Sequence, residues 1–162
     1  MIFDLQIRAQ LENVGQIIPS DADDFEWNVM FKCSGCGEER DTFRVLSLSD
    51  TSTGKSGKGE AHLVETCHFC GRANTVVIME KSGAIPYLEA DSGSFKTLCS
   101  LDCRGLEPTK FKLGGGFRVS ASNSKTVFDD VALADEEWTE YDATAKESLS
   151  IMEVESRFVK RK

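Results

Sequence analysis

Phe31-Lys32-Cys33-Ser34-Gly35-Cys36-Gly37-Glu38 and, further along, Cys67-His68-Phe69-Cys70-Gly71 are the stretches that decide how this chain folds. Each holds two cysteines separated by two residues, and such a pair can bind one metal ion from a single tight turn. Two pairs supply four sulfurs, the tetrahedral set that Zn²⁺ prefers at about 2.3 Å. The glycine after each pair suits the left-handed backbone that such a turn often needs. The predicted Zn²⁺ ligands are therefore Cys33, Cys36, Cys67 and Cys70.

Length and composition place the chain among globular proteins of one large domain or two small ones. It has 162 residues, 40% of them apolar, and six cysteines. The first ten residues include Asp4 and Arg8 and no apolar run, so we expect no secretory signal. The apolar run 76–79 is far too short to cross a membrane. We expect a cytoplasmic protein with access to the nucleus, no membrane association, and cysteines that are ligands or free thiols rather than disulfides.

The net charge of −8 is concentrated in one segment. Residues 129–155 hold ten acidic side chains and one basic one, whereas acidic and basic residues nearly balance before them. Nucleic-acid binding needs a basic surface, so we expect no nucleic acid partner. The acidic segment is interpreted as a solvated surface, with a docking face for a basic partner as the alternative.

Alternating apolar residues predict a mostly-β protein. Residues 3–11 read as a long strand with one buried face, and residues 25–31 as its partner strand. Further strands are expected at residues 43–48, 61–66, 75–79 and 95–103, with a closing strand over 151–159. Each cysteine pair then lies where a hairpin turns. Trp138 and Tyr141, three residues apart, predict a short helix within residues 135–148.

The second half of the sequence resembles the first. Trp27-Asn28-Val29 is matched by Phe117-Arg118-Val119, and residues 43–50 by residues 128–135, with five positions missing where the first cysteine pair would stand. We therefore expect two pseudo-symmetric antiparallel β units, residues 1–92 with the zinc site and residues 93–162 without its ligands. Chance similarity between strand-turn-strand sequences is the alternative.

Several segments together resemble the eukaryotic CXXC-motif-containing zinc-binding protein family. They are Phe31 to Glu38, Cys67 to Arg72, Cys103-Arg104-Gly105-Leu106-Glu107-Pro108 and Asp135-Glu136-Glu137-Trp138-Thr139-Glu140-Tyr141-Asp142. The resemblance runs from about residue 3 to residue 160. It implies an elongated, mostly-β protein with two similar halves and one zinc bound by four cysteines, which map to Cys33, Cys36, Cys67 and Cys70. The residues around 55–58 are where we expect this chain to differ from its relatives.

Four thiolates leave zinc no open position for water or substrate, so the predicted zinc is structural and the protein is not an enzyme. The function expected is that of a monomeric protein-interaction or adaptor module with a protein partner. The alternative is a thiol redox or metal-transfer protein that uses the two cysteine pairs. A third option is an RNA- or ribosome-associated zinc ribbon, whose binding would weaken steeply with salt.

Other candidate residues receive simpler interpretations. Cys99 and Cys103, four apart on one strand, lie about 13 Å from each other if the strand is regular, so we expect two buried thiols. His68 is expected to face solvent, with ligation of the metal as the alternative, and His62 to be an ordinary surface or interface side chain. Residues 49–59 contain Gly54-Lys55-Ser56, a partial match to a phosphate-binding loop, and are interpreted as a hairpin loop.

Overall fold

The structure is a computed structural model that describes residues 1–53, 60–79 and 85–162. Two expectations fall outside the described residues. These are the partial phosphate-loop match at Gly54-Lys55-Ser56 and the expected insertion at residues 55–58.

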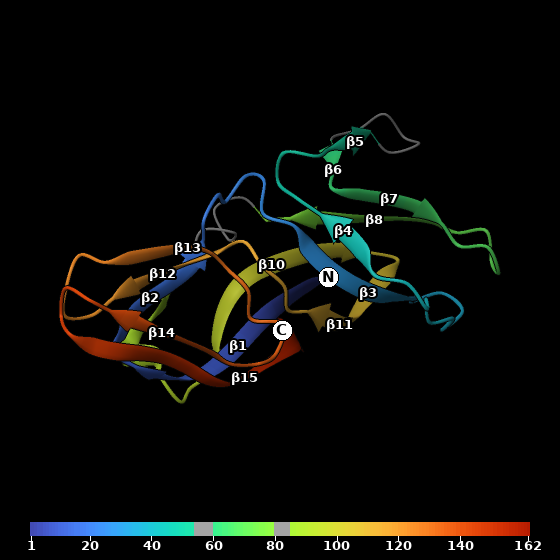
Figure 1. The fold of residues 1–162 in the computed structure, drawn as a ribbon. Coiled ribbons are helices and arrows are strands. Elements are labelled where there is room, and N and C mark those ends of the chain that lie inside the picture. The colour runs from blue at the N-terminus through green and yellow to red at the C-terminus, as the bar shows by residue number, and fades with distance from the viewer. Residues whose placement is uncertain (54–59, 80–84) are drawn as a thin grey trace.

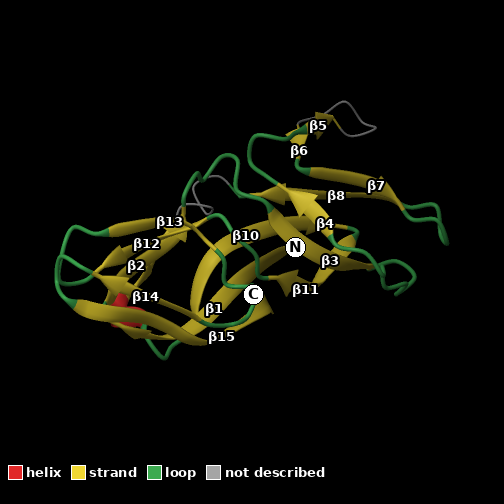
Figure 2. Cartoon of the chain, viewed as in Figure 1, coloured by secondary structure: helices red, strands yellow, loops and turns green. Residues whose placement is uncertain are grey.

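Strands make up most of the described chain, which confirms the mostly-β prediction (Figure 2). They are β1 (Ile2–Glu12), β2 (Val14–Pro19), β3 (Trp27–Cys33), β4 (Arg44–Leu46), β5 (Ser52–Thr53), β6 (Glu60–Ala61), β7 (Leu63–Thr66), β8 (Ala73–Ile78), β9 (Tyr87–Leu88), β10 (Lys96–Arg104), β11 (Leu106–Lys112), β12 (Phe117–Ala121), β13 (Val127–Val131), β14 (Trp138–Asp142) and β15 (Glu147–Lys160). One 3₁₀ turn, η2 (Glu89–Asp91), follows β9. Among the described residues no helix is long and apolar enough to cross a lipid bilayer.

The described strands pair into four antiparallel sheets. The largest has the order β14-β15-β1-β10-β8-β7, and it runs the length of an elongated molecule (Figure 1). A sheet β13-β12-β2-β9 lies toward one end and a sheet β11-β3-β4 toward the other, with the small pair β5-β6 beyond it. The cysteine turns after β3 and β7 therefore project from one end of the molecule.

The long strand β1 forms the centre of this arrangement, as its alternation predicts. Phe3, Leu5, Ile7 and Ala9 are all buried, while the residues between them are partly exposed. β1 pairs with β10 on one side and with β15 on the other. Burying one face of so long a strand fixes its register, because a slip of one residue would turn the apolar side chains to solvent.

Two expectations about local structure are wrong. β3 does not pair with β1 but lies between β11 and β4, because the chain leaves the large sheet at Asn13 and continues as β2 in a different sheet. Residues 135–148 form no helix; they contain strand β14 and the turn that leads to β15. Residues 138–142 pair with β15, and Trp138 packs edge-on against Phe128 of a different sheet at 5.3 Å between ring centroids. These contacts outweigh the local helix preference.

The strands toward the two ends of the molecule pair in the same pattern. In the large sheet β1 is followed outward by β15 and β14, and β10 by β8 and β7. β2 pairs with β12, which pairs with β13, just as β11 pairs with β3, which pairs with β4. Each of these sheets contains strands from both sides of residue 92, so the first and second halves of the sequence are interleaved in the fold. The division of the sequence at residue 92, and its origin in a duplication, stay predictions.

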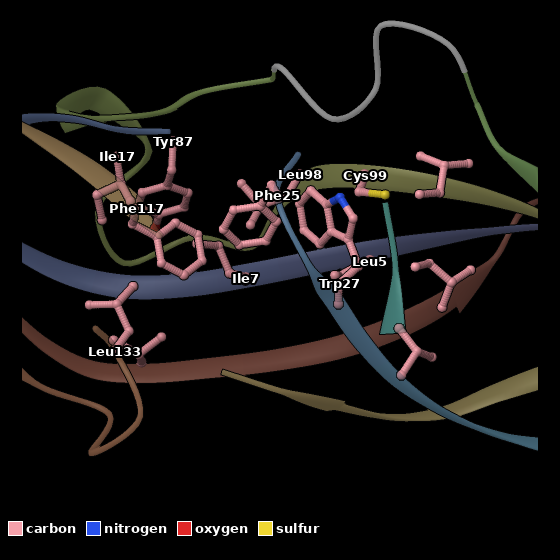
Figure 3. Packing of buried hydrophobic residues seen from close by; sticks show 14 of the residues in the cluster. Leu5, Ile7, Ile17, Phe25, Trp27, Tyr87, Leu98, Cys99, Phe117 and Leu133 are labelled. Atoms are coloured by element: carbon pink, nitrogen blue, oxygen red, sulfur yellow. The ribbon is translucent and has the colours of Figure 1, made fainter. Parts of the chain in front are cut away.

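The core lies between the large sheet and the smaller ones; it is mostly aliphatic, with several aromatic side chains packed among the aliphatic ones (Figure 3). Phe25 contacts both Trp27 and Phe117, at 4.5 and 5.0 Å between ring centroids. Pairs of this kind contribute about 0.5–1.5 kcal/mol beyond their buried area. Cys99 is part of this cluster and Cys103 is buried with it, which confirms that both are buried thiols.

Candidate metal centre

Both cysteine pairs lie in turns at the same end of the molecule. Cys33 is the last residue of β3, and the chain after it folds back so that Glu39 pairs with Lys32. Cys67 follows β7, and the turn that it begins leads directly into β8. The prediction that each pair lies where a hairpin turns is confirmed, although the two hairpins belong to different sheets.

The four sulfur atoms form a compact cluster. All of them lie within 4.8 Å of one another. The Sγ atoms of Cys33 and Cys70 are 3.7 Å apart, and so are those of Cys36 and Cys67. A regular tetrahedron with Zn–S bonds of about 2.3 Å has sulfur–sulfur edges of about 3.8 Å. The donor set, four soft sulfurs at this spacing, fits one Zn²⁺ ion, and its softness would also suit Cu(I).

The two turns have the same backbone geometry. The N–H of Gly37 donates to the Cys33 carbonyl at 2.8 Å, and the N–H of Gly71 to the Cys67 carbonyl at 2.9 Å. Both glycines have positive φ, 77° and 73°, as expected for the residue after each pair. Since a side chain there would be strained, glycine keeps both turns tight enough to point two sulfurs the same way.

Backbone N–H groups aim at the sulfurs and shift their acidity. The N–H groups of Cys70 and Phe69 lower the pKa of the Cys67 thiol to about 6, against burial, which raises it. The N–H of Cys36 is the largest cause of the lowered pKa of Cys33. The N–H of Glu38 also lowers the pKa of Cys36, but burial and the neighbouring sulfurs raise it to about 11. The site thus favours thiolates, yet the sulfurs cannot all ionise together unless a cation offsets their charge.

A buried ion pair supports the cluster from one side. Arg40 donates from Nε to Glu65 at 3.1 Å, and both side chains are only 10% exposed. Arg44 reaches the other carboxylate oxygen of Glu65 at 2.7 Å. Burial lowers the pKa of Arg40, but Glu65 and the Cys67 sulfur, to which Arg40 also donates, raise it above its usual value. The arginine therefore stays charged and partly offsets the negative charge of the thiolates.

The corner between β10 and β11 holds the first cysteine turn in place, a role that sequence reasoning did not assign. Gly105 has φ of 85°, and its carbonyl accepts the N–H of Ser34 at 3.0 Å. The fully buried side chain of Asn74 packs against Gly105, and in its better amide orientation it donates to the Gly105 carbonyl at 3.3 Å. Gly105 lies in the segment Cys103 to Pro108, one of those that carried the family resemblance, and that segment was the feature of the sequence that pointed to this corner.

The remaining candidates stay outside the cluster. His68 is exposed, as expected. The ring of His62 accepts the N–H of Ile78 at 2.8 Å through Nδ1, so it belongs to the β-sheet structure behind the site. Cys99 and Cys103 lie in β10 and are absent from the four-sulfur cluster found among the described residues.

Known proteins resemble this chain over its whole length. Residues 4–159 match the sequence profile of the family described as CXXC motif containing zinc binding protein, eukaryotic. A protein of that name from Xenopus laevis is 41% identical over 98% of both chains, and one from Homo sapiens is 40% identical over 96% of both. The crystal structure of C1orf123 has a TM-score of 0.93 at 38% identity and covers 99% of this chain and 100% of its own.

A hypothetical protein from Plasmodium falciparum has the same fold, with a TM-score of 0.88 at 21% identity over 98% of this chain and 99% of its own. The match of the family profile over nearly all residues, together with relatives at about 40% identity over the full length, agrees with the four-sulfur cluster. The chain belongs to the eukaryotic family of CXXC motif containing zinc binding proteins.

Proposed function

We propose that this zinc-binding protein is a non-catalytic interaction module in which Cys33, Cys36, Cys67 and Cys70 bind one structural zinc ion as four thiolates. The sulfur–sulfur distances of 3.7 Å support this ligand set, because they match the edge of a zinc–sulfur tetrahedron. A zinc ion with four protein ligands has no position left for a water molecule whose pKa it could lower. The four thiolates also leave the centre with a charge of about −2, which makes it a poor Lewis acid.

The observation that carries the interaction role is the exposure of Phe69. This ring stands between the two cysteines of the second turn and is 71% exposed, more than any other large apolar side chain among the described residues. The turn beneath it is fixed by N–H bonds to the Cys67 sulfur. Aromatic side chains, phenylalanine among them, are enriched at protein interfaces, and a ring carried on a fixed turn offers apolar area without ordering the backbone on binding. The proposed partner is a protein, bound by a monomer of this chain in the cytoplasm.

Replacing Phe69 with alanine tests this role. The Phe69→Ala variant should retain its zinc and its thermal stability but lose at least tenfold in affinity for a captured protein partner, since an interface hot spot contributes about 2 kcal/mol or more. Tyr141→Ala is the matched control, because Tyr141 is also an exposed aromatic, at 58%, and belongs to β14, a strand at the other end of the molecule (Figure 1). Equal binding by wild type and Phe69→Ala would overturn the assignment of this surface.

A redox or metal-transfer role is the second candidate. One observation favours it: Cys36 and Cys70 are exposed, so an incoming thiol or oxidant can reach two of the four sulfurs. Alkylation of the native protein separates the two roles. The interaction module predicts that zinc protects all four ligand thiols and that zinc content stays stoichiometric. A transfer or redox protein would instead release the metal readily or accumulate a Cys33–Cys36 or Cys67–Cys70 disulfide.

A further inference from the structure

The end of the molecule opposite the cysteine cluster contains two turns that occupy corresponding places in the fold. They are the turn between β12 and β13 and the turn between β14 and β15, which lie side by side at that end (Figure 1). In the repeated strand pattern they correspond to the turns after β3 and β7, which carry the cysteines. The connection from β3 to β4 covers residues 34–43 and that from β12 to β13 only residues 122–126, so the second is five residues shorter.

Backbone hydrogen bonds fix the correspondence of the first turn. Each turn has the same two bonds with the same lengths: Ser34 to Gly105 and Ser122 to Asn13, both 3.0 Å, and Cys33 to Glu38 and Ala121 to Thr126, both 2.9 Å. Gly105 and Asn13 are also alike, because each is a single residue with positive φ between two long strands. Ala121 therefore stands where Cys33 stands, and Ser124 stands where Cys36 stands. Counted back from these positions Phe117 corresponds to Val29, so the sequence match of Phe117 with Trp27 is two positions out of register.

Strand register fixes the second turn in the same way. At the cysteine end, Leu63 of β7 pairs with Val76 of β8, which pairs with Cys103 of β10. At the opposite end, Trp138 of β14 pairs with Ile151 of β15, which pairs with Leu11 of β1. Cys103 lies two positions before Gly105, and Leu11 lies two positions before Asn13. Four residues after Leu63 comes Cys67, and four residues after Trp138 comes Asp142. The next positive φ falls at Gly71 and at Lys146, four residues further in both turns. Asp142 therefore takes the place of Cys67, and Ala145 that of Cys70.

Asp142 accepts the same two backbone N–H bonds as Cys67, and two hydroxyl bonds besides. The Cys67 sulfur accepts the N–H groups two and three residues after it, and Asp142 Oδ1 accepts the N–H groups of Thr144 and Ala145, again two and three residues after it, at 3.0 and 3.3 Å. The hydroxyls of Ser124 and Thr126 also donate to this carboxylate, at 2.5 and 2.8 Å, from the facing turn. The carboxylate is fully buried, yet it has four donors.

We propose that the Asp142 cluster is the metal-free counterpart of the cysteine cluster: hydroxyl-to-carboxylate hydrogen bonds join the two turns here as zinc joins them at the other end. Two of the four ligand positions are alanines, Ala121 and Ala145, which offer no donor atom to a metal. One more bond crosses between the turns, from the Asn123 amide to Glu147 at 2.6 Å. The consequence is a molecule with two differently held ends, of which only the cysteine end loosens when zinc is lost or its thiols are oxidised.

Electrostatics agree with a cluster that needs no cation. The Ser124 hydroxyl, followed by Thr126 and two backbone N–H groups, holds the pKa of Asp142 below its usual value despite burial. A buried carboxylate that accepts four hydrogen bonds can stay ionised without a cation beside it. The cysteine cluster differs in this respect, because its sulfurs need a positive ion.

Hydrogen exchange with two perturbations tests the proposal. Asp142→Ala should speed amide exchange at residues 121–126 and 142–146 at least tenfold and lower the melting temperature by about 5–15 °C, with zinc content unchanged. Chelation should do the reverse, speeding exchange at residues 33–38 and 67–72 while residues 121–126 and 142–146 stay protected. Glu140→Ala is the matched control, since it removes an exposed acidic side chain from the same strand. A melting temperature of Asp142→Ala equal to that of this control, or loss of protection at both ends on chelation, would overturn the proposal.

A gain of metal binding tests the residue correspondence itself. The fourfold variant Ala121→Cys, Ser124→Cys, Asp142→Cys and Ala145→Cys should bind one zinc more per chain than the wild type, measured as metal content after gel filtration. The twofold variant Ser124→Cys and Asp142→Cys, which leaves alanine at the other two positions, offers only two ligands and should bind no additional zinc. A folded fourfold variant with unchanged metal content would contradict the correspondence, and should it fail to fold, the exchange experiment alone decides. The comparison of the Asp142 cluster with the zinc centre rests on the proposed zinc ligands. The effect of Asp142→Ala on exchange and melting does not depend on those ligands.

Discussion

Removal of zinc by a strong chelator is expected to lower the melting temperature by at least about 20 °C and to unfold the cysteine end first. Structural zinc sites of this kind bind with about 10–16 kcal/mol, whereas a whole domain is stable by only about 5–15 kcal/mol. The two cysteine turns lie in different sheets and are joined at their tips by the sulfur cluster. Without the ion, the partly ionised sulfurs repel one another. The short strands β4 and β7 keep the ion pair of Arg44 with Glu65 but lose the centre that joins their turns. The measurement is a thermal melt with and without chelator.

Single cysteine substitutions give the same result without a chelator. Cys67→Ala should lose zinc and a large part of the stability, because three sulfurs hold the ion less tightly. Cys99→Ala is the control, since Cys99 is a buried thiol in β10 away from the cluster. It should keep full zinc content and lose only about 1 kcal/mol for the small cavity. A chelated protein or Cys67→Ala variant that melted like the wild type would show that the ion does not hold this end together.

Gly105→Ala is expected to destabilise the protein by about 2–5 kcal/mol and to weaken zinc retention. A Cβ atom at this position would lie 2.0 Å from the Asn74 side chain, which is fully buried, and φ is 85°. The left-handed backbone alone costs alanine about 1–2 kcal/mol, and forcing an extra atom into packed surroundings adds about 1–3 kcal/mol. The Gly105 carbonyl also fixes Ser34 in the first cysteine turn, so its displacement moves a ligand-bearing loop. Chemical denaturation with parallel metal analysis measures both effects.

Two further variants isolate the cause. Gly114→Ala is the matched control, because no atom lies within 4 Å of the added Cβ and the backbone needs no positive φ there. It should change stability by less than about 0.5 kcal/mol. Combining Asn74→Ala with Gly105→Ala should cost less than the sum of the two single changes, because the clash is then absent. Full additivity would mean that the contact between these two residues is not the source of the loss.

The sequence was informative where a pattern repeats locally. The alternation in residues 3–11 predicted the buried face of β1, since one-sided burial leaves a period of two. The spacing of the cysteines predicted which residues gather in one cluster, and the two glycines predicted the positive φ that follows each pair. These features depend on a few neighbouring residues, so a single sequence can express them.

The sequence was uninformative where structure depends on distant partners. Nothing in residues 25–31 indicates that β3 pairs with β11, some 80 residues later, rather than with β1. The residues around Trp138 have the composition of a helix, but they pair with β15, Trp138 packs on Phe128 of a different sheet, and the segment is extended. Asp142 stood in the motif that carried the family resemblance, yet its role is apparent only once Ser124 and Thr126 are seen to donate to it.

The most direct test of the central claim is X-ray absorption at the zinc edge of the purified protein. The account predicts one zinc per chain with four sulfur neighbours at about 2.3 Å, contributed by Cys33, Cys36, Cys67 and Cys70. A shell of nitrogen or oxygen atoms at about 2.0–2.1 Å, or fewer than four sulfurs, would contradict it, because such a centre has either another ligand set or an open position.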